Sequence, residues 1–248
     1  METIVQSSPP TYLYCVSRRG VSLPDTLKGV GESPLEVITW GGLAGVCSVL
    51  PKDGYSFTLQ DLFLHKEVVE YVHTLLAVIP MRFSTTLKRR EAVVELLQRH
   101  SSQLEETLDR LKDMVEISLR VVLEGEAGSP LPVPVSGERA EALSGPALER
   151  SEGIEYLRQK RQVQEEGRQL GLRAEEVCKV LEQRLRPLIA ESQLESSRYM
   201  SSIYYLVRRD RLEEFERAFG EMRGRLPEKV LYSGPWPPYS FVPEFLEI

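Results

Sequence analysis

The sequence predicts an α+β fold of two domains, in which helices pack on the faces of small sheets. Two strand-forming runs flank Gly41 and Gly42, which is the signature of a hairpin. Apolar residues recur at helical spacing in the stretch after this hairpin, and residues 115–123 alternate apolar and polar side chains. We therefore expect a small mixed α+β domain over residues 1–112 and a second α+β domain over residues 113–248.

Composition limits the classes of function. With 248 residues and 42% hydrophobic content, the chain can bury the cores of two small domains. The net charge of −6 argues against a nucleic-acid binder, because phosphate contacts need a basic surface. Cys15, Cys47 and Cys178 lie far apart, so we expect reduced, buried thiols and no metal site. No apolar run approaches the ~20 residues that span a bilayer, which predicts a cytoplasmic protein outside the membrane.

The N-terminal domain is expected to begin with a strand at residues 12–17. The hairpin follows, with strands at residues 35–40 and 43–50. Because the second of these runs is apolar on both faces, we predict that it is a central strand. Gly45 lies within this run and has two interpretations. We favour a position beneath a packed helix, where only a small residue fits, over a close approach of another backbone segment.

Thr58 and Asp61 have the spacing of a capping box, which predicts the start of an amphipathic helix that runs to Pro80. His65 and His73 fall between the apolar positions of this helix, two turns apart. They could belong to a metal site or to a solvated helix face. We favour the solvated face, because no acidic or cysteine partner has metal-ligand spacing with them.

Pro80 is expected to end that helix, because proline lacks an amide donor, and a short strand at residues 81–85 is expected to follow. We interpret Pro80, Arg82 and Phe83 as a structural turn, in which the guanidinium binds carbonyl oxygens or an internal carboxylate. The alternative is that Arg82 lies over a cleft and binds an anion. Two helices are expected next, the second beginning with a capping box at Ser102.

The C-terminal domain is expected to be a modified ferredoxin-like sandwich with a long helix. Residues 125–146 are rich in glycine and proline and predict a flexible loop. The first half of the long helix, 159–169, has few apolar residues, so we expect it to project or to be covered by a partner. The term ferredoxin-like describes the chain path alone, since the cysteines cannot hold an iron–sulfur cluster. The expected elements are a strand at 115–123, the helix within 147–190, a strand at 200–208, a helix capped by Asp210 and a strand at 230–232.

The tail over residues 233–248 combines prolines with large aromatic rings. We favour docking of the tail on its own domain, because such rings are costly to leave in water. The alternative is that the tail presents its rings to a partner, as extended proline-rich segments can. The candidate residues are Trp236, Pro237, Pro238, Tyr239 and Phe241.

Several stretches together match the pattern of one protein family. They are Tyr12-Leu13-Tyr14, Leu43-Ala44-Gly45-Val46, His65 leading into Ile79-Pro80-Met81-Arg82-Phe83, the alternating strand after Met114, and Ser233-Gly234-Pro235-Trp236-Pro237-Pro238-Tyr239-Ser240-Phe241. Through them the chain resembles the gas vesicle protein F/L family (GvpF/GvpL) over nearly its whole length. Two positions depart from the pattern: Ser84 stands where glycine is usual, and Ile117 where an aromatic residue is common.

The resemblance implies an accessory or minor structural protein of the cytoplasm and the gas vesicle, needed to build these gas-filled protein shells. It implies contacts with the hydrophobic major shell protein and with other gas vesicle accessory proteins. It implies no enzymatic activity, cofactor or small-molecule substrate. The residues agree in showing no nucleophile–base pair, phosphate loop or metal cluster. The competing hypothesis is a small-ligand-binding or regulatory domain of ferredoxin-like fold, with a polar pocket around Arg82.

Overall fold

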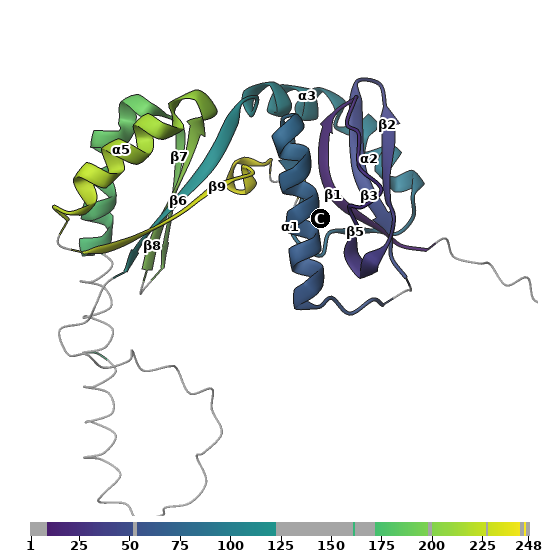
Figure 1. Ribbon diagram of the computed structural model, residues 1–248, viewed down its shortest axis with the longest axis horizontal. Helices are drawn as coiled ribbons and strands as arrows, with labels where there is room; N and C mark the ends of the chain where they lie inside the picture. Colours follow the sequence, from purple (N-terminus) through teal and green to yellow (C-terminus); the bar gives the residue numbers. More distant parts are fainter. Residues whose placement is uncertain are drawn as a thin grey trace, which may run out of the picture.

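The computed structural model describes residues 9–51, 54–122, 161, 172–197, 200–226, 228–243 and 246. In this part of the chain, two antiparallel sheets each carry helices (Figure 1). We call residues 9–112 the N-terminal half and residues 113–246 the C-terminal half. The predicted loop at 125–146 lies outside the described residues, as does 159–169 apart from Arg161.

The sheet of the N-terminal half has the strand order β2-β3-β1-β4, with β5 paired to β1. The predicted hairpin is confirmed, and its second strand lies between two others, as expected for a central strand. A Cβ atom built on Gly45 would lie 2.7 Å from Val93 Cγ1, so this glycine does lie beneath a packed helix. The strands are β1 (Thr11–Arg18), β2 (Leu35–Trp40), β3 (Leu43–Val49), β4 (Val78–Pro80) and β5 (Thr86–Leu87).

Helices cover both faces of this sheet. On one face, α1 (Leu59–Leu75) packs on β1 and β3. On the other, α2 (Glu91–Arg99) and α3 (Ser101–Arg110) pack on the same strands (Figure 1). The break between α2 and α3 confirms the prediction of two helices. The predicted cap at Ser102 is wrong, because α3 already begins one residue earlier and follows His100.

The start of α1 is as predicted, but its end is not. Thr58 Oγ1 accepts a hydrogen bond from the Asp61 amide, and Asp61 Oδ2 accepts one from the Thr58 amide, at 3.2 and 2.8 Å. The helix ends at Leu75, and β4 (Val78–Pro80) pairs with β1 where a continuing helix was expected. Pro80 therefore lies in a strand opposite Cys15. Proline is tolerated there because β4 is at the edge of the sheet, where one side of the strand needs no amide donor.

The sheet of the C-terminal half has the order β7-β8-β6-β9, and every pair is antiparallel. Helical residues 172–185 and α5 (Leu212–Arg223) lie together on one face of it (Figure 1). The predicted cap at Asp210 is wrong: α5 follows Arg211, and the Asp210 carboxylate pairs with Arg208 at 2.9 Å. The strands are β6 (Met114–Val122), β7 (Ile189–Ser197), β8 (Met200–Arg208) and β9 (Lys229–Trp236).

Strand β7 was not predicted. The long helix was expected to extend to residue 190, but a short 3-10 turn, η2 (Arg186–Leu188), separates its end from β7. Strand β7 is polar and lies at the edge of the sheet, so its sequence carries little of the apolar alternation that marks a half-buried strand. Strand β9 is also longer than the three residues expected, and it runs through Pro235 to Trp236.

Candidate functional site

The tail begins within β9, and its part after Trp236 crosses from the C-terminal half to the N-terminal half. Its 3-10 turn, η4 (Tyr239–Phe241), lies between the sheet of the C-terminal half and α1 (Figure 1). Trp236 is half-buried, and Pro237 and Pro238 are buried. Phe241 is 2% exposed and belongs to a core cluster that contains residues of both halves. The tail thus lies in the interface between the two halves, which we call the seam; it is the region where Phe241 packs with Leu111 and Leu206.

A buried histidine of α1 receives the tail. The Tyr239 hydroxyl lies 3.4 Å from His65 Nε2, and the Tyr12 hydroxyl lies 2.9 Å from His65 Nδ1. His65 is only 2% exposed, so the prediction of a solvated face is wrong for this residue. Burial lowers the pKa of His65 to about 4, because the charged ring would lose its hydration. At neutral pH His65 is therefore an uncharged member of an aromatic cluster with Tyr12 and Tyr14.

The second histidine of α1 also faces protein. His73 Nε2 lies 3.0 Å from the Met114 carbonyl oxygen at the start of β6, and the guanidinium of Arg209 donates to the His73 carbonyl at 2.8 Å. Burial and the neighbouring Arg209 charge lower the pKa of His73 to about 4. The expectation of a solvated face is wrong here too, because His73 helps to join the two halves.

Glu116 of β6 contacts the tail and was not predicted from the sequence. It is buried, and its two carboxylate oxygens accept hydrogen bonds from the Ser240 amide at 2.7 Å and the Ser240 hydroxyl at 3.0 Å. Burial raises the pKa of Glu116, and the two bonds from Ser240 oppose that rise. The alternation of β6 predicts that Glu116 lies on a solvent-facing side of the strand. The tail and the N-terminal half cover that side, because Leu206, the partner of Glu116 in β8, packs in one cluster with Leu111.

Two cations add to the attachment of the tail. Arg110 of α3 donates through Nη2 to the Phe241 carbonyl oxygen at 2.6 Å, and its Nη1 pairs with Glu191 of β7 at 2.6 Å. The Lys66 ammonium lies 4.7 Å from the centre of the Trp236 ring, within the range of a cation–π contact. The structure thus brings the predicted tail residues together with α1, α3 and β6.

The turn at Pro80, Arg82 and Phe83 is built differently from the expectation. Residues 81–85 form no strand, and the Arg82 carbonyl oxygen accepts hydrogen bonds from the Thr85 amide at 3.2 Å and the Thr85 hydroxyl at 2.7 Å. The Phe83 ring packs against the Phe57 ring, and the centres of the two rings are 5.4 Å apart. The Arg82 side chain is exposed, and the role of its guanidinium in the turn stays a prediction.

A pocket of about 440 Å³ lies at the seam, and Arg82 is not among its lining residues. Two pairs of its polar groups bond to each other: Arg18 Nη2 pairs with Asp109 at 2.8 Å, and Arg209 donates to the His73 carbonyl. These bonds join neighbouring elements and favour a structural seam over a ligand site. The lining includes Arg18, His73, Leu76, Asp109, Lys112 and Arg209.

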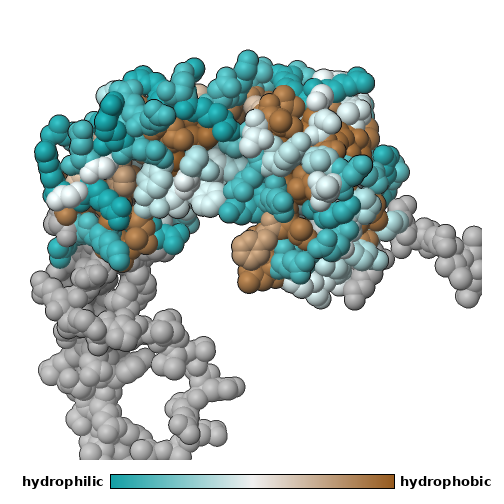
Figure 2. Space-filling view, viewed as in Figure 1, coloured by the Kyte–Doolittle hydropathy of each residue, from teal (hydrophilic) through white to brown (hydrophobic). Residues whose placement is uncertain are grey.

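The outer face of α1 carries an apolar surface. Leu59, Leu62 and Phe63 are 69%, 40% and 61% exposed, and we call these three residues the α1 stripe. These residues lie at the N-terminal end of α1, where Figure 2 shows hydrophobic atoms beside the hollow between the two halves. The sequence contains an indication of this exposed surface. Helix α1 has more apolar residues than can be buried on the one face formed by Val68, Val69 and Val72.

Within the described residues, no group of three or more His, Cys, Asp and Glu side chains is placed to hold a metal ion. In the same part of the chain, no helix has the length and apolar character needed to cross a bilayer. The three cysteines are buried and free, as predicted.

Comparison with known proteins decides the family. A family model described as gas vesicle synthesis protein GvpL/GvpF matches residues 10–243. The chain belongs to the GvpL/GvpF family. This confirms the resemblance of its sequence and supports a role connected with gas vesicles. GvpL/GvpF is a gas vesicle family and not a known family of enzymes.

Relatives in this family match over nearly the whole chain. Gas vesicle protein F of a Streptomyces strain is 30% identical over 241 residues, which cover 94% of this chain and 99% of the relative. Gas vesicle protein L of the same strain is 25% identical and covers 93% and 91%. The crystal structure of GvpF from Anabaena superposes with a TM-score of 0.70 at 20% identity, covering 95% of this chain and 97% of that one. That likeness shows a shared fold.

Proposed function

We propose that this GvpL/GvpF family member is an accessory or minor structural protein of gas vesicle assembly, located in the cytoplasm and at the vesicle. It acts by binding the hydrophobic shell protein and other gas vesicle proteins. The observation that carries the proposal is the α1 stripe, where Leu59 and Phe63 leave most of their apolar surface in water. A contiguous apolar patch of this kind is often functional, as a contact surface for another apolar surface. A shell subunit needs such cover until it enters the shell, because its apolar surface would otherwise self-associate in water.

The architecture suits a binding role. We propose two domains, residues 1–112 and 113–248, of which the second is ferredoxin-like. The β7-β8-β6-β9 order, with two helices on one face, supports that description. We further propose that Trp236, Pro237, Pro238, Tyr239 and Phe241 act mainly inside the protein. The bonds of Ser240 to Glu116 and of Arg110 to Phe241 support this role, because they attach the tail to both halves.

Capture of the shell protein tests the proposal. The purified, tagged chain is mixed with the shell protein of the same organism, and an unrelated protein of similar size and charge serves as the control. We expect the shell protein to be retained by this chain and not by the control. Deletion of the gene is expected to abolish vesicle formation, and the wild-type gene is expected to restore it. Normal vesicles in the deletion strain would contradict an essential role in assembly.

A further inference from the structure

We infer that the α1 stripe is the docking site for an amphipathic α-helix of the apolar shell subunit, and that this helix carries lysine or arginine beside its apolar face. The inference rests on the proposed function and deepens it. It assigns a surface, a kind of secondary structure and a charge to the contact.

The spacing of the stripe favours a helix as the occupant. Leu59, Leu62 and Phe63 occupy positions i, i+3 and i+4 of α1, so their side chains form one ridge on its outer face. This is the pattern by which one helix anchors another. One turn further along, Lys66 and Glu70 pair at 3.7 Å and end the apolar surface. From Leu59 to Phe63 the ridge extends about 6 Å along α1, at 1.5 Å per residue, and one crossing helix of roughly 10 Å diameter is enough to cover it.

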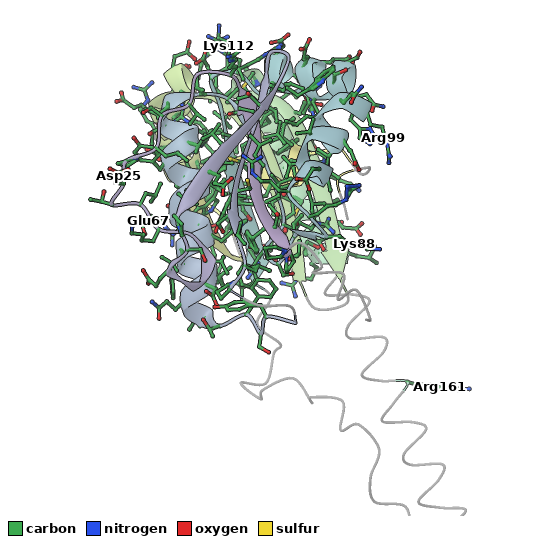
Figure 3. The ribbon with its side chains drawn as sticks, turned by 90° about the vertical axis from the view of Figure 1, so that its right-hand side faces the viewer. Asp25, Glu67, Lys88, Arg99, Lys112 and Arg161 are labelled. Atoms are coloured by element: carbon green, nitrogen blue, oxygen red, sulfur yellow. The ribbon has the colours of Figure 1, made fainter. Side chains whose placement is uncertain are left out.

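Among the described residues, two exposed carboxylates border the stripe. Glu67 is exposed on α1 and points away from the body of the molecule in Figure 3. Glu32 is exposed and accepts a hydrogen bond at 3.0 Å from Gln60, which is the neighbour of Leu59. A nearby cation, Lys66, lies between Glu70 and the Trp236 ring, which offset its charge. A partner with basic residues beside its apolar face complements this border, whereas a bilayer of anionic lipids would be repelled by it.

The size of the stripe argues against a second copy of this chain as its occupant. The three side chains together expose on the order of 300 Å². A symmetric pair of copies would then bury about 600 Å² in total, roughly half of what a stable, specific dimer needs. The stripe alone is therefore too small for a stable symmetric pair, and its occupant needs further contacts. A partner helix that is longer than the stripe can make them along the hollow that adjoins it (Figure 2).

A photo-crosslinking experiment identifies the occupant. Phe63→p-benzoylphenylalanine is made in the full chain, which is co-expressed with the shell protein and irradiated. The matched control carries the same group in place of Leu194, which is 53% exposed on β7. We expect a cross-link from position 63 to a helix of the shell protein, and about tenfold less product from position 194. A cross-link to a second copy of this chain, or equal products from both positions, would overturn the inference.

Substitutions test the energetics of the same contact. Leu59→Ser with Phe63→Ser is expected to reduce capture of the shell protein at least tenfold, because each lost anchor weakens binding and 1.4 kcal/mol corresponds to about tenfold. Leu194→Ser is expected to change it less than about twofold. Glu67→Lys is expected to weaken capture about threefold, and the charge-matched control Glu213→Lys is expected to leave it unchanged. The melting temperature verifies that each variant folds, since all of these side chains are exposed.

The outcomes separate this inference from the proposed function. If the wild-type chain captures the shell protein and the double serine variant captures it equally well, the docking site is elsewhere, and the proposed function stands. If the wild-type chain captures no shell protein, the proposed function fails, and the inference fails with it.

Discussion

Phe241→Ala is expected to lower the free energy of unfolding strongly, because the ring is buried in the seam. Phe241 is 2% exposed and packs in a cluster that contains Leu111 of the N-terminal half and Leu206 of the C-terminal half. Truncation of a buried phenylalanine costs about 3–5 kcal/mol, through lost burial and the cavity that remains. For a chain of this size each kcal/mol lowers the melting temperature by roughly 2–4 °C. We therefore expect a fall of about 10 °C.

Thermal unfolding followed by circular dichroism measures this change, with urea unfolding as a second measure. Trp236→Ala is the first control: its ring is half-buried and contacts Lys66, so its loss is expected to cost less, about 1–2 kcal/mol. Leu231→Ala, at an exposed position of β9, is expected to cost less than about 1 kcal/mol. Capture of the shell protein by the folded fraction of Phe241→Ala is expected to stay at the wild-type level. A melting temperature within about 2 °C of wild type would refute the structural role of the ring.

Three further predictions follow from the core and from α1. Gly45→Ala is expected to cost about 1–3 kcal/mol in urea unfolding, because its Cβ would lie 2.7 Å from Val93 Cγ1, and Val93→Ala in the same chain should return part of that loss. Thr58→Ala is expected to cost about 1 kcal/mol by the same measurement, because it removes the side-chain cap of α1; an unchanged urea midpoint would contradict this. The folded-state pKa values of His65 and His73 lie near 4, below the ordinary 6.5, so protons bind preferentially to the unfolded chain between these values. Stability is therefore expected to be complete above pH 6.5 and to fall towards pH 4, by at most roughly 3 kcal/mol per histidine, and variants with glutamine at these positions should lose that dependence.

The features that the sequence predicted correctly are those decided by neighbouring residues. The turn at Gly41 and Gly42 needs residues that tolerate positive φ, and Gly41 has φ of +56°. The capping box needs only Thr58 and Asp61, three residues apart. The alternation in β6 is likewise a local pattern, and the strand is present.

The features that were missed depend on segments far apart in the chain. Val78 and Ile79 fit the spacing of α1 as well as that of a strand, and pairing with β1 decides between them. His65 is buried because Tyr12 and Tyr239 close over it, and Tyr239 is 174 positions away. The burial of Glu116 depends on Ser240 in the same way. No periodicity within one element carries such information.

In the candidate site, too, local features were predictable from the sequence and contacts between distant segments were not. The aromatic and proline content of the tail marks Trp236, Tyr239 and Phe241 as candidates from the sequence alone. Their separate environments were not predictable, since burial of Phe241 and partial exposure of Trp236 depend on where α1 and α3 lie. The α1 stripe could be suspected from surplus apolar positions. Which of them remain exposed is decided by the strands that α1 covers.

The most direct test of a binding role is the molar mass of the complex in solution. The tagged chain and the shell protein are co-expressed, purified by the tag and analysed by size-exclusion chromatography with light scattering. We expect a species heavier than the 28.2 kDa chain that contains the shell protein in a fixed ratio. The Leu59→Ser, Phe63→Ser variant is expected to elute without it. Elution of the wild-type chain free of the shell protein, with all of the shell protein in the insoluble fraction, would contradict the account.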